Sequence, residues 1–458
     1  MSELHESQFR AMQAAFARQG TGIEVAYTPN GRPDYIYQVG RLLVDTRVPG
    51  LVGEIEGVLP GVAPVDKGEQ PQSDFLRVYS IEDLNNGLFV TVPEALDLID
   101  ARLREHPILH AYPGERGEEL ARSGEYSPVT PVHVLHITQD TGDGAGRVCQ
   151  AAEPEVPCSC PPNVNCPQCS PYPPEPPAVS SAGAGVLIGV CDTGLLTWNG
   201  PVAPWPWLQN VTGDPDPLGP VLVSVPPIPP GLNAIPVYTG HGTFVAGVAR
   251  GQAPGAGVQV SGDLVIGGGV LETTIVANLM NLLANFPAVN VVNLSAGGYT
   301  RHDFVPLSFT VLDLDKVYGD VPLVAAAGND ATHRKFWPAA FHWVVGVGAL
   351  GADQRDRAWF SNYGRWVNVY ALGEGLVNAY ATGVYTYQEP PKRPHQQIFN
   401  GMARWSGTSF AAPLVAGQIA AMMTTAPGGP VSAVQAQTEV LQLAAQQAIP
   451  GVGPALYP

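Results

Sequence analysis

The chain has 458 residues, of which 45% are hydrophobic, and its formal net charge is −17. This length predicts two or three domains with a sizeable core. The negative charge argues against nucleic acid or an anionic membrane surface as a partner, and no run approaches the roughly 18 consecutive apolar residues that span a bilayer.

The first residues, Met1-Ser2-Glu3-Leu4-His5-Glu6-Ser7, are polar. They lack the basic stretch followed by an apolar one that marks a secretory signal, so we expect a cytoplasmic protein. The alternative is a secreted protein whose leader has been trimmed.

Residues 1–148 have the pattern of an α+β domain. Strands are expected over residues 76–79, 87–92 and 132–137, where β-branched and aromatic residues gather. Between the last two, Pro93 is placed to open a helix in which Leu96, Ile99 and Leu103 share one apolar face.

Residues 149–183 form a linker rich in proline and cysteine. Repeated Pro-Pro pairs exclude regular helices and strands here. Cys158, Cys160, Cys166 and Cys169 lie close enough in sequence to bind zinc, to form two disulfides or to stay free thiols, and the spacing leaves all three open.

Residues 184–458 alternate between apolar runs and helical spacing. Strands are expected at 186–191, 291–294, 322–326, 343–347 and 366–370, with helices over 272–285, 308–318 and 431–446 and another beginning near Thr408. This alternation predicts an α/β fold, a doubly wound parallel sheet with helices on both faces, preceded by the smaller α+β N-terminal domain.

Three motifs in this region carry the chemistry: Cys191-Asp192-Thr193-Gly194, His241-Gly242-Thr243 and Gly407-Thr408-Ser409. Asp192 ends a predicted buried strand, where functional side chains of such sheets gather. His241 lies between two glycines and can exchange a proton near neutral pH. Ser409 is expected at a helix N-terminus, where free N–H groups can face a developing oxyanion. In this order the three residues are typical of an orienting acid, a base and a nucleophile.

The motifs and their order resemble those of the subtilisin-like serine proteases, the subtilase family. The resemblance covers about residues 184–448 and implies a subtilisin-like fold and a serine endopeptidase that acts through an acyl-enzyme on Ser409. It also assigns Asn329, in Ala327-Gly328-Asn329, to the oxyanion site. A substrate-binding strand is implied at Ser295, Ala296, Gly297 and Gly298.

The same resemblance implies how such an enzyme is controlled. Residues 1–148 are interpreted as a propeptide that chaperones and inhibits the peptidase domain of residues 184–458, as in a zymogen. Cleavage within the linker would then create a new N-terminus between about 150 and 184. The partners are a protein or peptide substrate and the chain's own N-terminal region. No cofactor is needed for catalysis, no residue is assigned to a metal, and structural calcium is implied only by the family.

Departures from the family pattern keep other functions open. Residues 196–238 and 377–403 read as insertions that either narrow access to the active site or decorate the surface, and Phe410 replaces a methionine frequent in the family. The alternatives are a self-blocked or inactive peptide-binding module and a protease dedicated to maturing one precursor.

Overall fold

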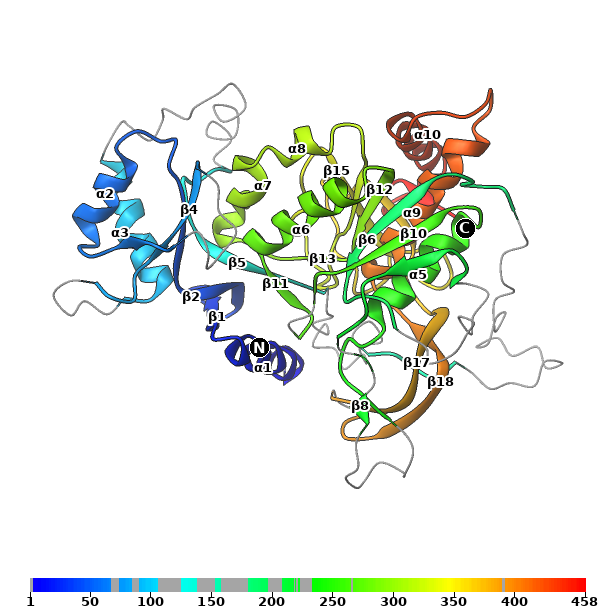
Figure 1. Ribbon diagram of the computed structural model, residues 1–458, viewed down its shortest axis with the longest axis horizontal. Coiled ribbons are helices and arrows are strands. Elements are labelled where there is room, and N and C mark those ends of the chain that lie inside the picture. Colours follow the sequence, from blue (N-terminus) through cyan, green and yellow to red (C-terminus); the bar gives the residue numbers. More distant parts are fainter. Residues whose placement is uncertain are drawn as a thin grey trace.

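A computed structural model describes residues 3–66, 74–84, 90–105, 125–137, 153–157, 180–196, 208–217, 219, 221–222, 233–264, 267–388 and 392–458; for 3–8, 221 and 222 only the backbone is described. Figure 1 shows an N-terminal region of helices and antiparallel strands beside a larger region built around a parallel sheet. No described helix is both long enough and apolar enough to cross a membrane.

The N-terminal region is organised around one long strand, β2, which pairs with β1, β4 and β5. Its side chains alternate between two faces. Leu42 and Val44 face α2 and α3, whereas Leu43 joins a second cluster that contains Met12 and Phe16 of α1. The elements are α1 (Glu3–Arg18), β1 (Ile23–Tyr27), β2 (Pro33–Asp45), α2 (Leu51–Val58), β3 (Ala63–Pro64), β4 (Leu76–Ser80), α3 (Val92–Arg104) and β5 (Val129–Ile137).

The strand expected over residues 87–92 is wrong at its described end. Thr91 is the N-cap of α3: its hydroxyl accepts the backbone N–H of Glu94, and the Glu94 carboxylate accepts the backbone N–H of Thr91. This capping box ends extended structure before Val92 and could have been read from the pattern Thr-x-x-Glu. Residues 87–89 lie outside the described residues.

The larger region contains an eight-stranded parallel sheet in the order β19-β16-β15-β14-β12-β6-β10-β7, which confirms the expected fold class. Side chains of β6 point alternately to two clusters, Val190 to one face and Cys191 to the other, as a strand covered on both sides requires. The strand expected over 366–370 begins later, at Val369. The strands are β6 (Leu187–Asp192), β7 (Val211–Gly213), β10 (Gly257–Gly262), β12 (Val289–Leu294), β14 (Leu323–Ala326), β15 (Val344–Leu350), β16 (Val369–Leu372) and β19 (Ala455–Leu456).

Helices cover both faces of this sheet (Figure 1). The two helices that carry His241 and Ser409, α5 and α9, pack against each other on one face, and α6 covers the other. The single helix expected over 308–318 is two short ones, because Asp313 adopts a positive φ of 50° between them. The helices are α5 (His241–Gln252), α6 (Glu272–Asn285), the 3-10 helix η4 (Arg301–Asp303), α7 (Leu307–Val311), α8 (Leu314–Val317), α9 (Thr408–Thr425) and α10 (Ala433–Gln446).

Part of the two sequence insertions forms a third sheet, in the order β18-β17-β9-β8. The long hairpin β17–β18 sends Tyr380, Phe399 and Trp405 into the same core as α5 and α9, so it is more than surface decoration. Its strands are β8 (Val221–Leu222), β9 (Asn233–Ile235), β17 (Leu376–Thr386) and β18 (Gln396–Trp405).

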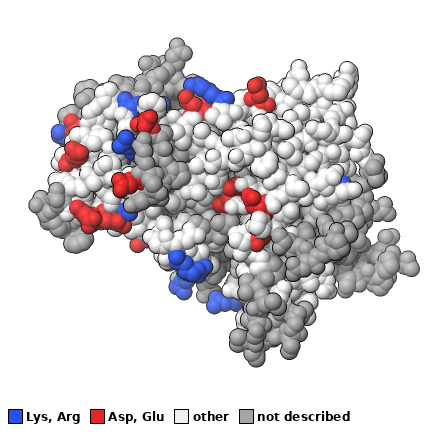
Figure 2. Space-filling model, in the orientation of Figure 1, with Lys and Arg blue, Asp and Glu red and all other residues white. Residues whose placement is uncertain are grey.

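Strand β5 joins the two regions. It leaves the N-terminal sheet and pairs antiparallel with β11 (Gly269–Leu271) and β13 (Ala296–Gly297) of the larger region. Ion pairs surround this junction: Arg301 contacts Asp97 and Asp100, and Arg334 contacts Asp34. Figure 2 shows that charged side chains gather over the N-terminal region, at the left of that view.

Candidate active site

Asp192 and His241 are in direct contact. The Nδ1 atom of His241 lies 2.7 Å from Oδ1 of Asp192, and both side chains are almost completely buried. Asp192 is the last residue of β6, and its Oδ1 also accepts the backbone N–H of Thr193. A carboxylate at this distance fixes the imidazole with a proton on Nδ1, which leaves Nε2 to act as a base.

Glycines permit this close approach of α5 to β6. A Cβ on Gly242 would lie 2.5 Å from the carbonyl oxygen of Gly194 and 3.1 Å from Cβ of Asp192. Gly240, the N-cap of α5, has a φ of 78°, a left-handed conformation that favours glycine. The Gly-His-Gly sequence is therefore required by the geometry on both sides of His241.

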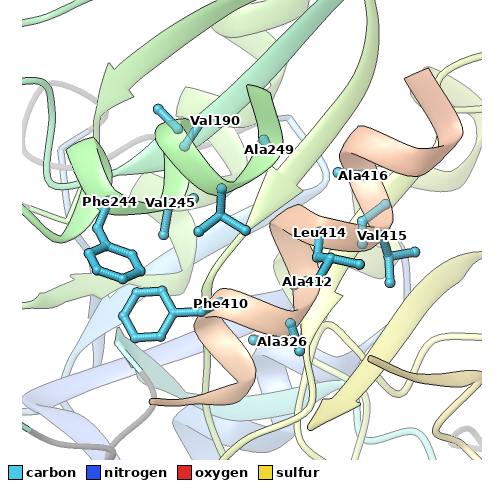
Figure 3. Packing of buried hydrophobic residues seen from close by; sticks show 14 of the residues in the cluster. Val190, Phe244, Val245, Ala249, Ala326, Phe410, Ala412, Leu414, Val415 and Ala416 are labelled. Carbon is cyan, nitrogen blue, oxygen red and sulfur yellow. The ribbon is translucent and has the colours of Figure 1, made fainter. Parts of the chain in front are cut away.

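Ser409 is the second residue of α9, as expected from the sequence. Helix α5 packs on α9: the rings of Phe244 and Phe410 are tilted against each other with centroids 4.6 Å apart, as Figure 3 shows. The imidazole of His241 contacts the rings of Phe410 and Trp405, at centroid distances of 5.2 and 5.4 Å. Phe410, which replaces the frequent methionine, thus forms one wall around the imidazole.

A proline inside α9 lets the Ser409 carbonyl group bind Ser295 of the expected substrate strand. Pro413 is the sixth residue of α9 and therefore lies beyond its first turn. Because proline has no N–H, it cannot donate to the carbonyl oxygen four residues earlier, that of Ser409. The Ser295 hydroxyl donates to this carbonyl at 2.7 Å instead, and Oγ of Ser409 lies 3.3 Å from the carbonyl oxygen of Ser295.

Asn329 follows β14 and lies at the N-terminus of α9. Its Oδ1 accepts both the backbone N–H and the hydroxyl of Thr408, each at 2.9 Å. Because the oxygen faces Thr408, the Nδ2 donor points away from Thr408 within the amide plane. Together with the backbone N–H of Ser409 in the first turn of α9, this arrangement can donate two hydrogen bonds to one oxyanion.

Ala296 and Gly297, which belong to the expected substrate strand, pair with the chain's own strand β5. Ile137 pairs with Ala296 and His136 with Gly297, while the opposite edge of β5 pairs with β11. Gly297 and Gly298 make room for close neighbours: a Cβ on Gly297 would lie 2.3 Å from the Phe336 ring, and one on Gly298 would lie 3.0 Å from the Val134 carbonyl oxygen. Strand β5 therefore fills the space between β11 and β13, which we call the groove.

Asp216 is a residue near the site that the sequence did not single out. It lies in the stretch interpreted as an insertion, and its buried Oδ2 accepts the backbone N–H of Gly240 at 2.8 Å and contacts the Thr193 hydroxyl at 3.4 Å. That hydroxyl in turn accepts the N–H of Gly242. No sequence signal marks Asp216, because the contact depends on the fold of the segment between Asp192 and His241.

A second carboxylate, Asp263, lies behind Asp192. Its backbone N–H donates to the Asp192 carbonyl oxygen at 2.7 Å, and its Oδ1 accepts the Ser261 hydroxyl. Burial is the main reason that the pKa of Asp263 is raised to about 6. Burial also raises the pKa of the neighbouring thiol of Cys191 well above its usual range, so this cysteine stays protonated and packs as a small apolar residue.

Two expectations from the sequence concern metal binding and the four clustered cysteines. Cys158, Cys160, Cys166 and Cys169 lie outside the described residues. Within the described ranges no three His, Cys, Asp or Glu side chains converge as metal ligands. We therefore assign no residue to the calcium that the family resemblance implies and derive no chemical step through a metal.

A sequence model of the subtilase family matches residues 183–452, which is more than half of the chain. The chain belongs to the subtilase family. The match includes the site residues described above, whereas strand β5 lies outside it. In this subtilase Asp192 contacts His241, and His241 contacts Phe410, the residue after Ser409.

Two curated relatives match part of this subtilase. The thermophilic serine proteinase of Bacillus sp. (strain AK1) is 32% identical over 198 residues, which are 40% of this chain and 42% of the relative. The extracellular serine proteinase of Thermus sp. (strain Rt41A) is 30% identical over 249 residues, 53% of this chain and 51% of the relative. The subtilase thus spans about half the length of these relatives.

The fold, including much of the N-terminal region, resembles one solved structure. Fervidolysin from Fervidobacterium pennivorans, described as a keratinolytic enzyme related to subtilisin, superimposes with a TM-score of 0.50 over 92% of this chain and 60% of its own. The sequence identity is 17%, so this likeness concerns the fold alone.

Proposed function

We propose that the protein is a serine endopeptidase. Ser409 attacks the carbonyl carbon of a peptide bond while Nε2 of His241 takes its proton, and Asp192 stabilises the imidazolium that forms. His241 then gives the proton to the leaving amine, and water hydrolyses the acyl-enzyme by the same route. The observation that carries the proposal is the 2.7 Å contact of Asp192 with a His241 held beside the Ser409 helix.

The oxyanion of the tetrahedral intermediate would be bound by Nδ2 of Asn329 and the backbone N–H of Ser409. The orientation of Asn329 supports this role, because Thr408 holds its oxygen with two hydrogen bonds. Loss of one such donor costs a serine protease roughly 100- to 1000-fold in turnover. The substrate would pair with Ser295, Ala296, Gly297 and Gly298 as an added strand.

We also propose that the N-terminal region inhibits the enzyme from within the same chain. Strand β5 occupies both edges of the groove in the way a substrate would, and the Ile137 N–H donates to the carbonyl oxygen of Gly268 at 2.8 Å. Polar contacts stabilise the interface: His133 contacts the buried Glu272 at 2.9 Å, and Arg301 forms ion pairs with two aspartates of α3. A substrate cannot enter while β5 is bound.

The strand register indicates which bond is cut when the block is removed. Ile137 pairs with Ala296, so in a peptide that continues this antiparallel ladder the next residue would oppose Ser295. The carbonyl oxygen of Ser295 lies 3.3 Å from Oγ of Ser409. The register thus predicts that Ser409 attacks the carbonyl of Thr138 and cleaves the bond to Gln139, both outside the described residues. This position precedes the terminus between about 150 and 184 that the linker suggested.

Labelling with a fluorophosphonate probe tests the endopeptidase proposal. The probe reacts with an activated serine, so the processed wild type should be labelled and turn over a peptide substrate, whereas Ser409→Ala should do neither. The alternative of a permanently self-blocked peptide-binding module predicts no labelling even after the N-terminal region is removed.

The cytoplasmic location expected from the sequence belongs to this proposal too, and cell fractionation would test it.

A further inference from the structure

The segment 153–157 is bound to the larger region by a short stretch of antiparallel backbone pairing. The N–H of Glu155 donates to the carbonyl oxygen of Arg404 at 2.8 Å, and the N–H of Arg404 donates to the carbonyl oxygen of Glu155 at 2.7 Å. Arg404 is the penultimate residue of β18, whose other edge pairs with β17. The segment therefore covers the edge of β18 that would otherwise be open.

Side chains hold the segment in this position. The carboxylate of Glu153, which is 6% exposed, accepts the Tyr385 hydroxyl at 3.0 Å and the backbone N–H of Gln388 at 2.7 Å. The Tyr387 hydroxyl donates to the carbonyl oxygen of Pro154, and Lys392 forms an ion pair with Glu155. A buried carboxylate with two donors is costly to withdraw, because the donors would then lose their acceptor.

The direction of the segment matches that of a substrate beyond the cut. Strand β18 ends at Trp405 and leads into α9, which carries Ser409, while β5 ends at Ile137 beside Ala296, the neighbour of Ser295. A peptide that continues past the cleaved bond along β18 therefore runs away from Ser409 and antiparallel to that strand. The segment 153–157 has this orientation and lies one residue from Trp405, whose ring contacts His241.

We propose that the segment 153–157 stays bound after the N-terminal region is released and permanently occupies the leaving-side edge of β18. This inference rests on the proposed endopeptidase function. Its consequence is a limit on specificity. Substrate residues close to the cleaved bond can still bind, but residues farther along find the β18 edge at Arg404 already paired.

Peptide length on the leaving side provides the test. Two internally quenched peptides would share one sequence before the cut and carry two or six residues after it. For the processed wild type we expect kcat/KM of the two peptides to agree within about twofold. In Glu155→Pro, which removes the N–H to Arg404, and in Glu153→Ala, the longer peptide should gain about tenfold, the effect of roughly one net backbone hydrogen bond.

Glu153→Gln is the matched control, because its amide oxygen can still accept from Tyr385 and Gln388, and it should behave as the wild type. A wild type that already prefers the longer peptide tenfold, or variants that gain nothing, would overturn the inference. Cleavage of the two-residue peptide, absent in Ser409→Ala, shows separately that the endopeptidase proposal holds. The mass of the active processed wild type gives a second readout: a chain that begins after residue 157 also overturns the inference, whether or not the variants fold.

Discussion

At the scale of single residues, side chains from distant segments hold the backbone around the reacting groups. Ser295 binds the carbonyl oxygen of Ser409, Thr408 orients Asn329, and Asp216 binds the N–H of Gly240. Each contact hydrogen-bonds a buried polar group, as buried polar groups require. Small errors of position at such sites cost large factors in rate, so these residues offer sharp tests.

Ser295→Ala should lower the free energy of unfolding by about 1–3 kcal/mol, because the Ser409 carbonyl oxygen loses its donor. In a Pro413→Ala background the cost should largely vanish, since an alanine N–H at position 413 can donate to this carbonyl within the helix. Denaturant melts of both pairs, made with Ser409→Ala to prevent self-digestion, measure the difference. Equal costs in the two backgrounds would contradict this account of Pro413.

Asp216→Ala should reduce kcat of the processed enzyme by about 10- to 100-fold with little change in KM, because the backbone on both sides of His241 loses its support while the substrate strand is untouched. Asp216→Asn, whose amide oxygen can still accept the Gly240 N–H, should lose less. Steady-state kinetics of both variants measure kcat and KM. A rise in KM with unchanged kcat would show that Asp216 acts on substrate binding and not on His241.

At the scale of elements, α1 extends the contact between the N-terminal region and the groove. Met12 and Phe16 are buried against Leu271 of β11 and Leu307 of α7. A Cβ on Gly269 would lie 2.7 Å from Sδ of Met12, so the glycine lets the helix approach β11 closely. The helix thus packs on the strand that forms one edge of the occupied groove.

Phe16→Ala should therefore speed release of the N-terminal region after processing, by at least tenfold given the usual cost of truncating a buried phenylalanine. The rate at which processed enzyme gains activity after dilution is the measurement. Tyr27→Ala is the matched control, because this aromatic residue of β1 is 51% exposed. Equal release rates for both variants would show that α1 does not contribute to inhibition.

The sequence predicted the elements with strong periodicity and left out those defined by their partners. Strand β6, helix α6 and the start of α9 follow from apolar spacing and motifs. Asp192, His241 and Ser409 follow from their three motifs, whereas Asn329 is assigned through the family resemblance. The hairpin β17–β18 was read only as an insertion, because its large apolar residues are buried by α5 and α9, which are distant in sequence. The pairing of β5 with β13 joins residues about 160 apart, a contact that no local pattern encodes.

At the scale of the whole molecule, the N-terminal region and the larger region share two apolar clusters, one antiparallel sheet and a set of ion pairs. Strand β5 carries two histidines into this interface. His133 contacts Glu272, and His136 stacks edge-on against Phe336. Release of the region should therefore depend on the protonation state of His136.

His136 predicts the direction of that dependence. Burial lowers its pKa in the docked state, whereas a released histidine titrates near about 6.5. Protonation of His136 therefore favours release. The affinity of the N-terminal region for the larger region is greatest above about pH 6.5 and falls as the pH drops below it. Release rates at pH 5.5 and 7.5 measure the effect, which His136→Gln should reduce. A variant that keeps the whole pH dependence would contradict this role of His136.

The central claim is that Ser409 cleaves the chain that lies in its own groove. Purified full-length protein should be incubated and the masses and N-termini of its products read over time. The account predicts a single early cut after Thr138 that yields a new N-terminus at Gln139, and no cut in Ser409→Ala. A first cut elsewhere in the chain, or the same cut in Ser409→Ala, would contradict it.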